Sequence, residues 1–258
     1  GQHYVTDQIA RNANNLSGTK VDPYFSIWLH DWEISQVADD VFLMQAKDDQ
    51  IEIDFRLENI KNVVLHGENG LSQKGEGLGN ASYYFSQTRL ETDGKLRIEN
   101  EWYEVSGLSW MDHEFGTSTL GEEQVGWDWF SIQLDNQSEI MLFQIRNDNG
   151  TISEYSSGAY VDSEDRTQHL TKDDFTVKVT DTWKNPKGLE YPSGWRITIE
   201  RLEMDLEITP VIKNQEMDLF FQYWEGAVYI EGTINGVEVS GYGYVELTGY
   251  AQSMQGVF

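Results

Sequence analysis

The sequence predicts an all-β protein made of two consecutive antiparallel β-barrel domains, over residues 1–116 and 117–258. Three observations lead to this prediction. Apolar and polar residues alternate along several segments, as they do in strands with one buried face. Short turn signals separate these segments. A stretch near the middle of the chain is similar to one near its end, which indicates a duplicated domain rather than a short-period repeat.

The alternation of apolar and charged residues is clearest at 51–58, where the sequence reads Ile-Glu-Ile-Asp-Phe-Arg-Leu-Glu. Residues 195–199 and 202–208 follow the same pattern. A period of two places the apolar side chains on one face of a strand and the charged ones on the other. Each segment is therefore predicted to be a strand with one face in a core and the other in water.

Turn signals divide the predicted strands into hairpins. Asn235-Gly236 stands between 228–234 and 237–245, and this dipeptide is the strongest two-residue hairpin signal. Asp135-Asn136 and Asp93-Gly94 mark two further predicted turns.

Three segments depart from the strand pattern. Residues 66–79 contain five glycines and lack the Lys-Ser/Thr ending of a phosphate-binding loop, so they are predicted to be a long loop. Small, polar and acidic residues at 116–126 indicate a linker between the two domains. Residues 7–16 are the best short candidate for a helix. Strands are thus expected to form nearly all of the regular structure.

The duplication is inferred from two segments that both end in an acid. Val105–Asp112 and Val239–Glu246 share Val-Ser-Gly, an aromatic residue three positions later, and a carboxylate two positions beyond that. The alternative is a chance similarity between generic β patterns. Two further pairs of segments favour duplication: Gln50–Phe55 with Gln215–Phe220, and Trp32–Ser35 with Trp195–Thr198.

Residues 127–134 and 139–146 are predicted to pair as the strands that open the second copy. At the offset of 163 between Trp32 and Trp195, their counterparts in the first copy would fall before residue 1. We therefore expect the first domain to lack its N-terminal strands in this chain.

The amino-acid composition limits the classes of partner that the protein can bind. The formal net charge of −26 disfavours binding to nucleic acid and to anionic membrane surfaces, because lysine and arginine make those contacts. No apolar run approaches the roughly 20 residues that span a bilayer, so no membrane span is expected. Cysteine is absent, which excludes disulfides and thiolate chemistry. Aromatic residues make up 13% of the chain, which suits a core or a pocket for a hydrophobic small molecule.

The most concentrated group of ionisable residues is Trp-Met-Asp-His-Glu-Phe-Gly at 110–116. Asp112, His113 and Glu114 are the candidate catalytic residues. On a strand, Asp112 and Glu114 share one face and His113 takes the other. Desolvation beside aromatic rings raises the pKa of a carboxyl group and suits it to act as a general acid. The alternative is a polar cluster that braces the two domains.

Candidate ligand-binding residues combine aromatic rings with polar groups. Trp127 and Trp129 lie on one face of a predicted strand, with Asp128 opposite. Core packing is the alternative role for these tryptophans. Neighbouring histidines at metal-ligand spacing are not found, so no metal site is expected. The full candidate set is Trp110, Tyr83, Tyr84, Trp127, Trp129, Gln144, Arg146, Trp224 and Glu246.

Two hydrolase classes are disfavoured. Glu52 to Glu58 resembles the E-x-D-x-x-E signature of laminarinase-like glycosidases, but the second glutamate is too far along the strand. Glycosidases need two carboxylates at a defined separation. The G-x-S-x-G motif of a serine nucleophile is absent.

Together, several of these motifs resemble the AttH/CrtC family, which includes carotenoid 1,2-hydratases and predicted secreted hydrolases. The resemblance implies two consecutive lipocalin-like barrels and a preceding family strand that this chain does not show. The segments that carry it are Val64–Gly67, Trp110–Gly116, Gly126–Phe130, Tyr191-Pro192, Tyr223–Gly226 and Gly243–Tyr250.

The resemblance also implies a function. It implies a cofactor-free acid–base enzyme of the hydratase, cyclase or isomerase type for a lipophilic polyene or terpenoid, with Asp112 as proton donor. The hydratase branch has Tyr where this chain has Trp110, and its His/Trp pair falls near 81–85, where neither residue occurs. The alternative is a non-catalytic carrier of an apolar ligand in the cell envelope. A periplasmic or secreted location and association with an ABC-type exporter are further expectations from the resemblance.

Overall fold

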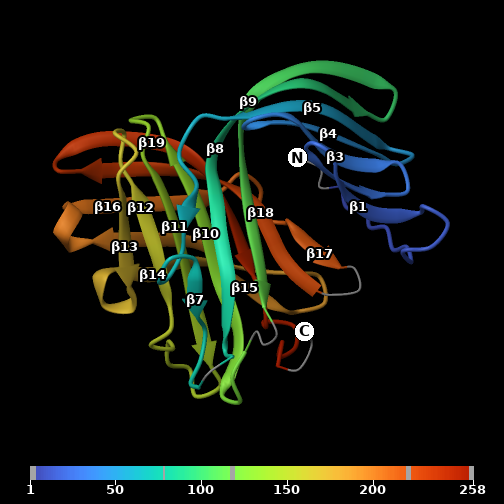
Figure 1. Ribbon diagram of the computed structural model, residues 1–258. Helices are drawn as coiled ribbons and strands as arrows, with labels where there is room; N and C mark the ends of the chain where they lie inside the picture. Colours follow the sequence, from blue (N-terminus) through green and yellow to red (C-terminus); the bar gives the residue numbers. More distant parts are fainter. Residues whose placement is uncertain (1–3, 78, 117–119, 219–221, 256–258) are drawn as a thin grey trace. The chain divides into compact units, whose positions relative to one another are not determined.

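The computed structural model describes residues 4–77, 79–116, 120–218 and 222–255 (Figure 1). Within these residues the regular structure consists of antiparallel strands and two short 3₁₀ turns, η1 (Lys172–Asp174) and η2 (Glu200–Leu202). The strands form two curled sheets, which confirms the predicted all-β class. No helix in the described part of the chain is long and apolar enough to cross a membrane.

Contacts divide the chain into two compact units. The smaller unit consists of Tyr4–Val63 and Gln87–Met111. The larger unit contains Val64–Ser86 and the chain from Asp112 onward. These units are defined by contacts and not by the repeated segments, so the domains 1–116 and 117–258 stay a prediction.

The smaller unit is a meander in which each strand pairs with the next. Its apolar side chains gather in a small core of Phe42, Leu57 and Leu90. The alternation at 51–58 places Leu57 in this core, while Glu58 projects to the other face. The strands are β1 (Ser17–Val21), β2 (Phe25–Leu29), β3 (Trp32–Ala38), β4 (Val41–Lys47) and β5 (Ile51–Asn59), which pairs with β8.

Two long strands, β8 (Ala81–Ile98) and β9 (Glu101–Gly116), pair with each other and extend through both units. The turn predicted at Asp93-Gly94 is wrong, because both residues lie inside β8 and pair with β5. A Cβ atom on Gly94 would come within 2.1 Å of the backbone oxygen of Asp54, so this glycine permits close strand approach. The chain turns instead after Ile98, where Glu99 adopts a φ of 56°.

In the larger unit, β8 also pairs with β6 (Val64–Leu65) and β7 (Leu71–Gln73). In its described residues, 66–77 and 79, the glycine-rich segment is therefore a loop that contains one short strand. The other sheet of this unit runs in the order β13-β12-β11-β10-β19-β18-β16-β15-β14. Its strands are β10 (Gln124–Leu134), β11 (Glu139–Asn147), β12 (Ser157–Val161), β13 (Thr167–Thr171), β14 (Thr176–Lys184), β15 (Glu190–Ile199), β16 (Met204–Pro210), β17 (Glu216–Asp218, paired with β18), β18 (Gln222–Ile234) and β19 (Val237–Leu247).

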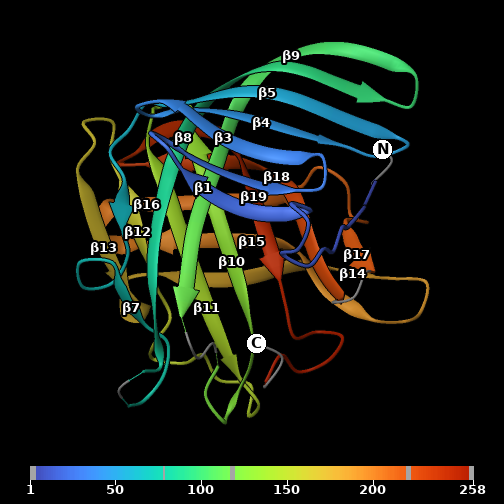
Figure 2. The ribbon, with the colours of Figure 1, turned by 45° about the vertical axis from the view of Figure 1, so that its right-hand side comes forward.

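The ten-stranded sheet has two different faces because its side chains alternate. On one face, Phe130, Trp195 and Trp224 pack into the large core that the curled sheet encloses. On the other face, Trp127, Trp129 and the facing residues of β11 and β19 line a pocket with residues of β8 and β9. Figure 2 shows the parts of β8 and β9 that belong to the larger unit beside β10 and β11. The site is thus built outside the enclosed core.

The local turn predictions have mixed outcomes. Asn235 and Gly236 adopt φ values of 50° and 75° between β18 and β19, as the two-residue hairpin requires. Asp135-Asn136 begins the turn between β10 and β11, as predicted. The helix predicted at 7–16 is wrong, since Asn14 and Asn15 adopt φ values of 53° and 60°. Part of the linker predicted at 116–126 lies outside the described residues.

Candidate active site

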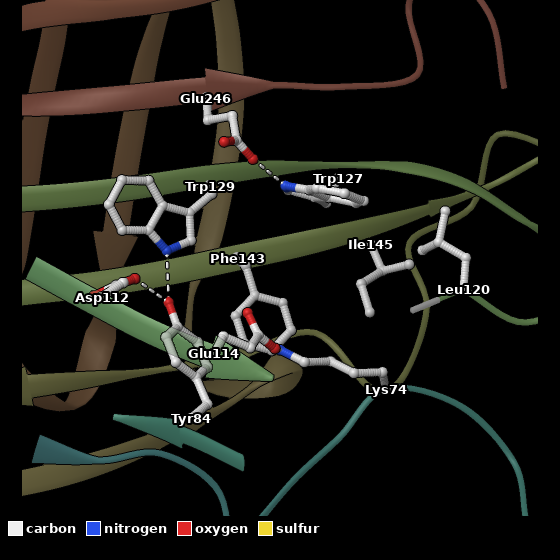
Figure 3. A pocket seen from close by; sticks show the side chains of 10 residues that line it. All are labelled: Lys74, Tyr84, Asp112, Glu114, Leu120, Trp127, Trp129, Phe143, Ile145 and Glu246. Atoms are coloured by element: carbon white, nitrogen blue, oxygen red, sulfur yellow. Dashed lines mark hydrogen bonds and ion pairs between the residues drawn. The ribbon is translucent and has the colours of Figure 1, made fainter. Parts of the chain in front are cut away.

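A pocket of about 330 Å³ lies between the β8–β9 pair and the outward face of the ten-stranded sheet in the larger unit (Figure 3). Its walls are aromatic and aliphatic, and charged groups interrupt them at a few positions. It is the kind of cavity that holds a lipophilic ligand and orients it with a few polar groups. The lining residues are Lys74, Tyr84, Asp112, Glu114, Leu120, Trp127, Trp129, Phe143, Ile145 and Glu246.

Sheet register places the pocket residues in rows. Trp129 pairs with Phe143 on β11 and with Glu246 on β19. Glu246 in turn pairs with Glu225 on β18. These four side chains form one row across the sheet, because directly paired residues point to the same face. The next row contains Trp127 and Ile145.

Asp112 is held by two hydroxyl groups. Tyr84 Oη donates a hydrogen bond to one carboxylate oxygen and Ser86 Oγ donates to the other. Trp129 Nε1 donates to Tyr84 Oη at 2.9 Å, which continues the chain of hydrogen bonds to the opposite sheet. Burial raises the pKa of Tyr84 well above its ordinary value, and the charge of Asp112 adds to the effect. Tyr84 therefore stays a neutral phenol and keeps the proton that it donates.

A buried histidine supports this arrangement from behind. His66 Nε2 lies 2.7 Å from Ser86 Oγ, and both residues are buried. Burial lowers the pKa of His66 to about 3, with the positive charges of Lys74 and His169 contributing. Because Ser86 donates to Asp112, its oxygen accepts from the neutral His66 Nε2–H. His66 and Ser86 thus fix the orientation of the Asp112 carboxylate.

Glu246 is the second acid in the pocket. Trp127 Nε1 donates to one of its carboxyl oxygens. Burial raises the pKa of Glu246 well above its ordinary value, and both a hydrogen bond with Glu225 and the negative charges of Glu225 and Asp112 add to this. Glu246 therefore keeps its proton to a higher pH than an exposed glutamate does, and Asp112, which accepts two hydrogen bonds, lines the same pocket.

Lys74 provides the positive charge of the pocket. Its side chain forms an ion pair with Glu114, with 3.0 Å between Nζ and Oε1, and Ser82 Oγ donates to the same oxygen. Nζ also lies 3.7 Å from the ring centre of Phe143 and 4.9 Å from that of Tyr84. These ring faces stabilise a buried cation by cation–π interactions.

The family model described as AttH-like matches residues 1–250 of the chain. The chain belongs to the AttH-like family. Membership confirms the resemblance that the sequence motifs indicated. A comparison with curated protein sequences finds no match.

Solved structures with a similar fold include another AttH protein. An AttH protein from Nitrosomonas europaea is 33% identical, with a TM-score of 0.80 over 87% of this chain and 69% of that chain. Kievitone hydratase from Nectria haematococca is 18% identical, with a TM-score of 0.71 over 88% and 70% of the two chains. CghA, in a structure with Sch210972, is 12% identical, with a TM-score of 0.59 over 92% and 74%. The last two proteins share the fold with this AttH-like chain.

The structure brings together six of the residues predicted for the site of this AttH-like protein. They are Asp112, Glu114, Tyr84, Trp127, Trp129 and Glu246, all of which line the pocket.

His113 and Tyr83 lie on the outward face of the β8–β9 pair. His113 stacks on Phe85, with 5.2 Å between ring centres, and Tyr83 stacks on Phe115 at 5.5 Å. This follows from strand alternation, which the sequence predicted for His113 relative to Asp112.

Three further predicted residues point to the opposite face of the ten-stranded sheet. Arg146 Nε pairs with Asp128 at 3.0 Å, and its guanidinium stacks on Tyr250. Gln144 is the cross-strand partner of Asp128 and shares that face. Trp224 is fully buried in the large core. Trp110 belongs to the smaller unit and is not among the residues that line the pocket.

Residues missed by sequence reasoning complete the site. Lys74 and His66 lie in or beside the glycine-rich segment predicted to be a loop, and Ser86 and Phe143 sit in strands that carried no motif. The one available signal was for His66, which lies in Val64–Gly67, a segment that carries the family resemblance.

The raised pKa of Glu246 predicts a pH-dependent cost in stability. The unfolded chain releases this proton near the ordinary value of 4.5, whereas the folded protein keeps it to a higher pH. The stability from the neutral acid is complete below pH 4.5 and is lost as pH rises through the raised pKa. The free energy of unfolding of Glu246→Gln should therefore fall less over this interval than that of the wild type. Chemical denaturation at a series of pH values measures this, and Glu238→Gln, at an exposed position of the same strand, should behave like the wild type.

Proposed function

We propose that this protein is an enzyme of the hydratase or cyclase type that performs acid–base chemistry on a lipophilic alkene. One observation carries the proposal: an aromatic pocket contains two carboxyl groups, Glu246 and Asp112, held by separate hydrogen bonds, and burial raises the pKa of Glu246. Hydration needs both groups, because one proton must reach the alkene and another must leave the attacking water. The structural neighbour named kievitone hydratase supports hydration as the reaction class.

In the proposed reaction, the carboxyl group of Glu246 transfers its proton to one alkene carbon and becomes a carboxylate. The neighbouring carbon becomes a carbocation, which the indole faces of Trp127 and Trp129 stabilise by cation–π attraction. Water then forms the new C–O bond, and Asp112 takes the proton that the water loses. Proton exchange with solvent then returns Glu246 to the acid form and Asp112 to the carboxylate. The net change is the addition of one water molecule.

The same groups support cyclisation when a second double bond of the substrate reaches the cation before water does. The new bond is then C–C, and Asp112 removes a proton from the adjacent carbon. The product has the mass of the substrate. This proposal assigns the proton-donor role to Glu246 and the base role to Asp112, whereas the sequence resemblance assigned proton donation to Asp112.

The test uses isotopically labelled water and a panel of prenylated and terpenoid alkenes. A hydratase should yield a product heavier by one water, carrying ¹⁸O from labelled water and one carbon-bound deuterium from D₂O. A cyclase should yield an isomer with deuterium and without ¹⁸O. Mass spectrometry of the material that co-purifies with the protein directs the choice of panel. Binding without any deuterium incorporation would overturn the proposal in favour of the carrier function.

The tryptophans of the pocket should contribute to ligand affinity. Trp127→Ala is expected to weaken binding of an apolar naphthalene probe by about ten-fold or more, because a large buried ring contributes roughly 1.5–3 kcal/mol. Trp127 is half-buried and lines the pocket, so the loss of stability should be smaller than for a core tryptophan.

Equilibrium dialysis measures the affinity for the probe. Trp102→Ala is the control, since Trp102 is 50% exposed in the smaller unit. Unchanged affinity in Trp127→Ala would contradict the assignment of this pocket as the ligand site. A periplasmic or secreted location and association with an exporter stay predictions.

A further inference from the structure

Lys74 is an unusual residue for the wall of a lipophilic pocket. Among the ten described lining residues it carries the single positive charge, and it is 9% exposed. Burial of an ammonium group is costly unless other groups stabilise it. Burial lowers the pKa of Lys74, and the charge of Glu114 and a hydrogen bond with it oppose this effect. Burying a charged lysine here therefore costs free energy that an apolar side chain in the same place would not cost.

The surroundings of Lys74 hold the ammonium in place without using all its donors. The ion pair with Glu114 uses one N–H, while the rings of Phe143 and Tyr84 stabilise charge without accepting a conventional hydrogen bond. The backbone is also fixed, since Lys74 N donates to Asn80 O at 2.8 Å and Gln124 Nε2 donates to Lys74 O at 2.8 Å. Donor capacity therefore remains for an oxygen atom in the pocket.

A pure hydrocarbon is a poor ligand for this site. It would displace water from the ammonium and supply no acceptor in return, which leaves buried donors unpaired. A site built around such donors rejects analogues that lack the matching acceptor. A full anion is also disfavoured, because Asp112 and Glu114 place two carboxylates against one ammonium.

We propose that Lys74 selects lipophilic ligands with a neutral oxygen acceptor, such as a ketone carbonyl or phenol oxygen, and orients that oxygen in the pocket. This inference rests on the proposed function and deepens it by naming the substrate class. Figure 3 shows the ammonium beside Tyr84 and Phe143, with Glu246 and Trp127 on the other side of the lining. An oxygen bound at Lys74 would leave the rest of the ligand facing Asp112 and Glu246.

The test compares three naphthalenes of similar shape: 2-acetylnaphthalene, 2-ethylnaphthalene and 2-naphthoate. Equilibrium dialysis gives the affinity of each for wild type and for Lys74→Met, which keeps side-chain length and removes charge and donors. Wild type should bind the ketone about ten- to a hundred-fold more tightly than the hydrocarbon, the range for a hydrogen bond to a charged group. Lys74→Met should lose this preference. Lys178→Met, at an exposed lysine on β14, should keep it.

Several results would overturn the inference. These are equal binding of ketone and hydrocarbon by wild type, tightest binding of naphthoate, no binding of any probe, or a ketone preference that survives in Lys74→Met. If Lys74→Met does not fold, Lys74→Gln serves in its place, because it removes the charge and should reduce the preference.

Binding is measured without turnover, so the inference and the proposed reaction fail separately. A Lys74-dependent ketone preference without deuterium incorporation would support the inference and overturn the reaction. Turnover of hydrocarbon alkenes with no ketone preference would support the proposed reaction and overturn the inference about Lys74.

Discussion

Replacing Glu246 with glutamine is expected to lower turnover by about two to four orders of magnitude, the usual contribution of a general acid. Glutamine keeps the size of the side chain and can still accept a hydrogen bond from Trp127 through its amide oxygen. It has no proton to give to an alkene. Ligand affinity should therefore stay close to that of the wild type while the rate falls. Turnover and affinity measured on the same variant separate the two effects.

The pH dependence of the reaction gives a second measure of the same role. Glu246 must be protonated to act, so wild-type turnover should fall as pH rises through its raised pKa. Glu225→Gln removes a neighbouring negative charge that helps to raise this pKa. Its alkaline limb should move to lower pH, while the maximal rate stays near the wild-type value. If Glu246 has only a structural role, the alkaline limb of the pH–rate profile should be the same in Glu225→Gln and in the wild type.

Asp112→Asn supplies the complementary test. Loss of the base should also reduce hydration by about two to four orders of magnitude, without loss of the fold. Ser86→Ala removes one of the two hydroxyls that orient Asp112, so it should cost less than Asp112→Asn. Full turnover in Glu246→Gln together with loss in Asp112→Asn would reverse the assignment and make Asp112 the proton donor. Full turnover in both variants would contradict acid–base chemistry at this pocket.

The positions of Asp112 and Glu246 in the pocket could be predicted from the sequence because the repeated motif contains both. Asp112 and Glu246 end the segments Val105–Asp112 and Val239–Glu246, which form parts of β9 and β19. Period-two alternation then determines which neighbours share a face with them. The same rule placed Trp127 and Trp129 together, and the pocket contains both.

Strand register could not be predicted from the sequence. This is why Gln144 and Arg146 were expected at the ligand site although they point to the opposite face of the sheet. Residues 140–143 of β11 are apolar on both faces, so alternation does not show which residues accompany Trp129. The register pairs Trp129 with Phe143 and sends Gln144 to the other side. Lys74 and His66 were missed for a related reason. Their positions depend on the pairing of β6 and β7 with β8, a long-range contact that leaves no local pattern.

Trp224→Ala is expected to destabilise the larger unit by about 3–5 kcal/mol, the range for truncating a large aromatic residue in a core. Trp224 is fully buried, its ring lies 5.9 Å from that of Trp195, and its Nε1 donates to Lys213 O at 2.8 Å. Truncation leaves a cavity that the surrounding strands cannot close, because the sheet curls around this core. The free energy of unfolding from chemical denaturation measures the loss.

The comparison with Trp127→Ala separates packing from ligand binding. Both changes remove an indole from the same sheet, but Trp224 faces the enclosed core and Trp127 faces the pocket. Trp224→Ala should therefore lose stability and, in the fraction that stays folded, bind the naphthalene probe normally. Trp127→Ala should show the opposite pattern. A Trp224→Ala protein that keeps its stability and loses the probe would return Trp224 to the ligand-binding role predicted from the sequence, and would place the ligand inside the curled sheet.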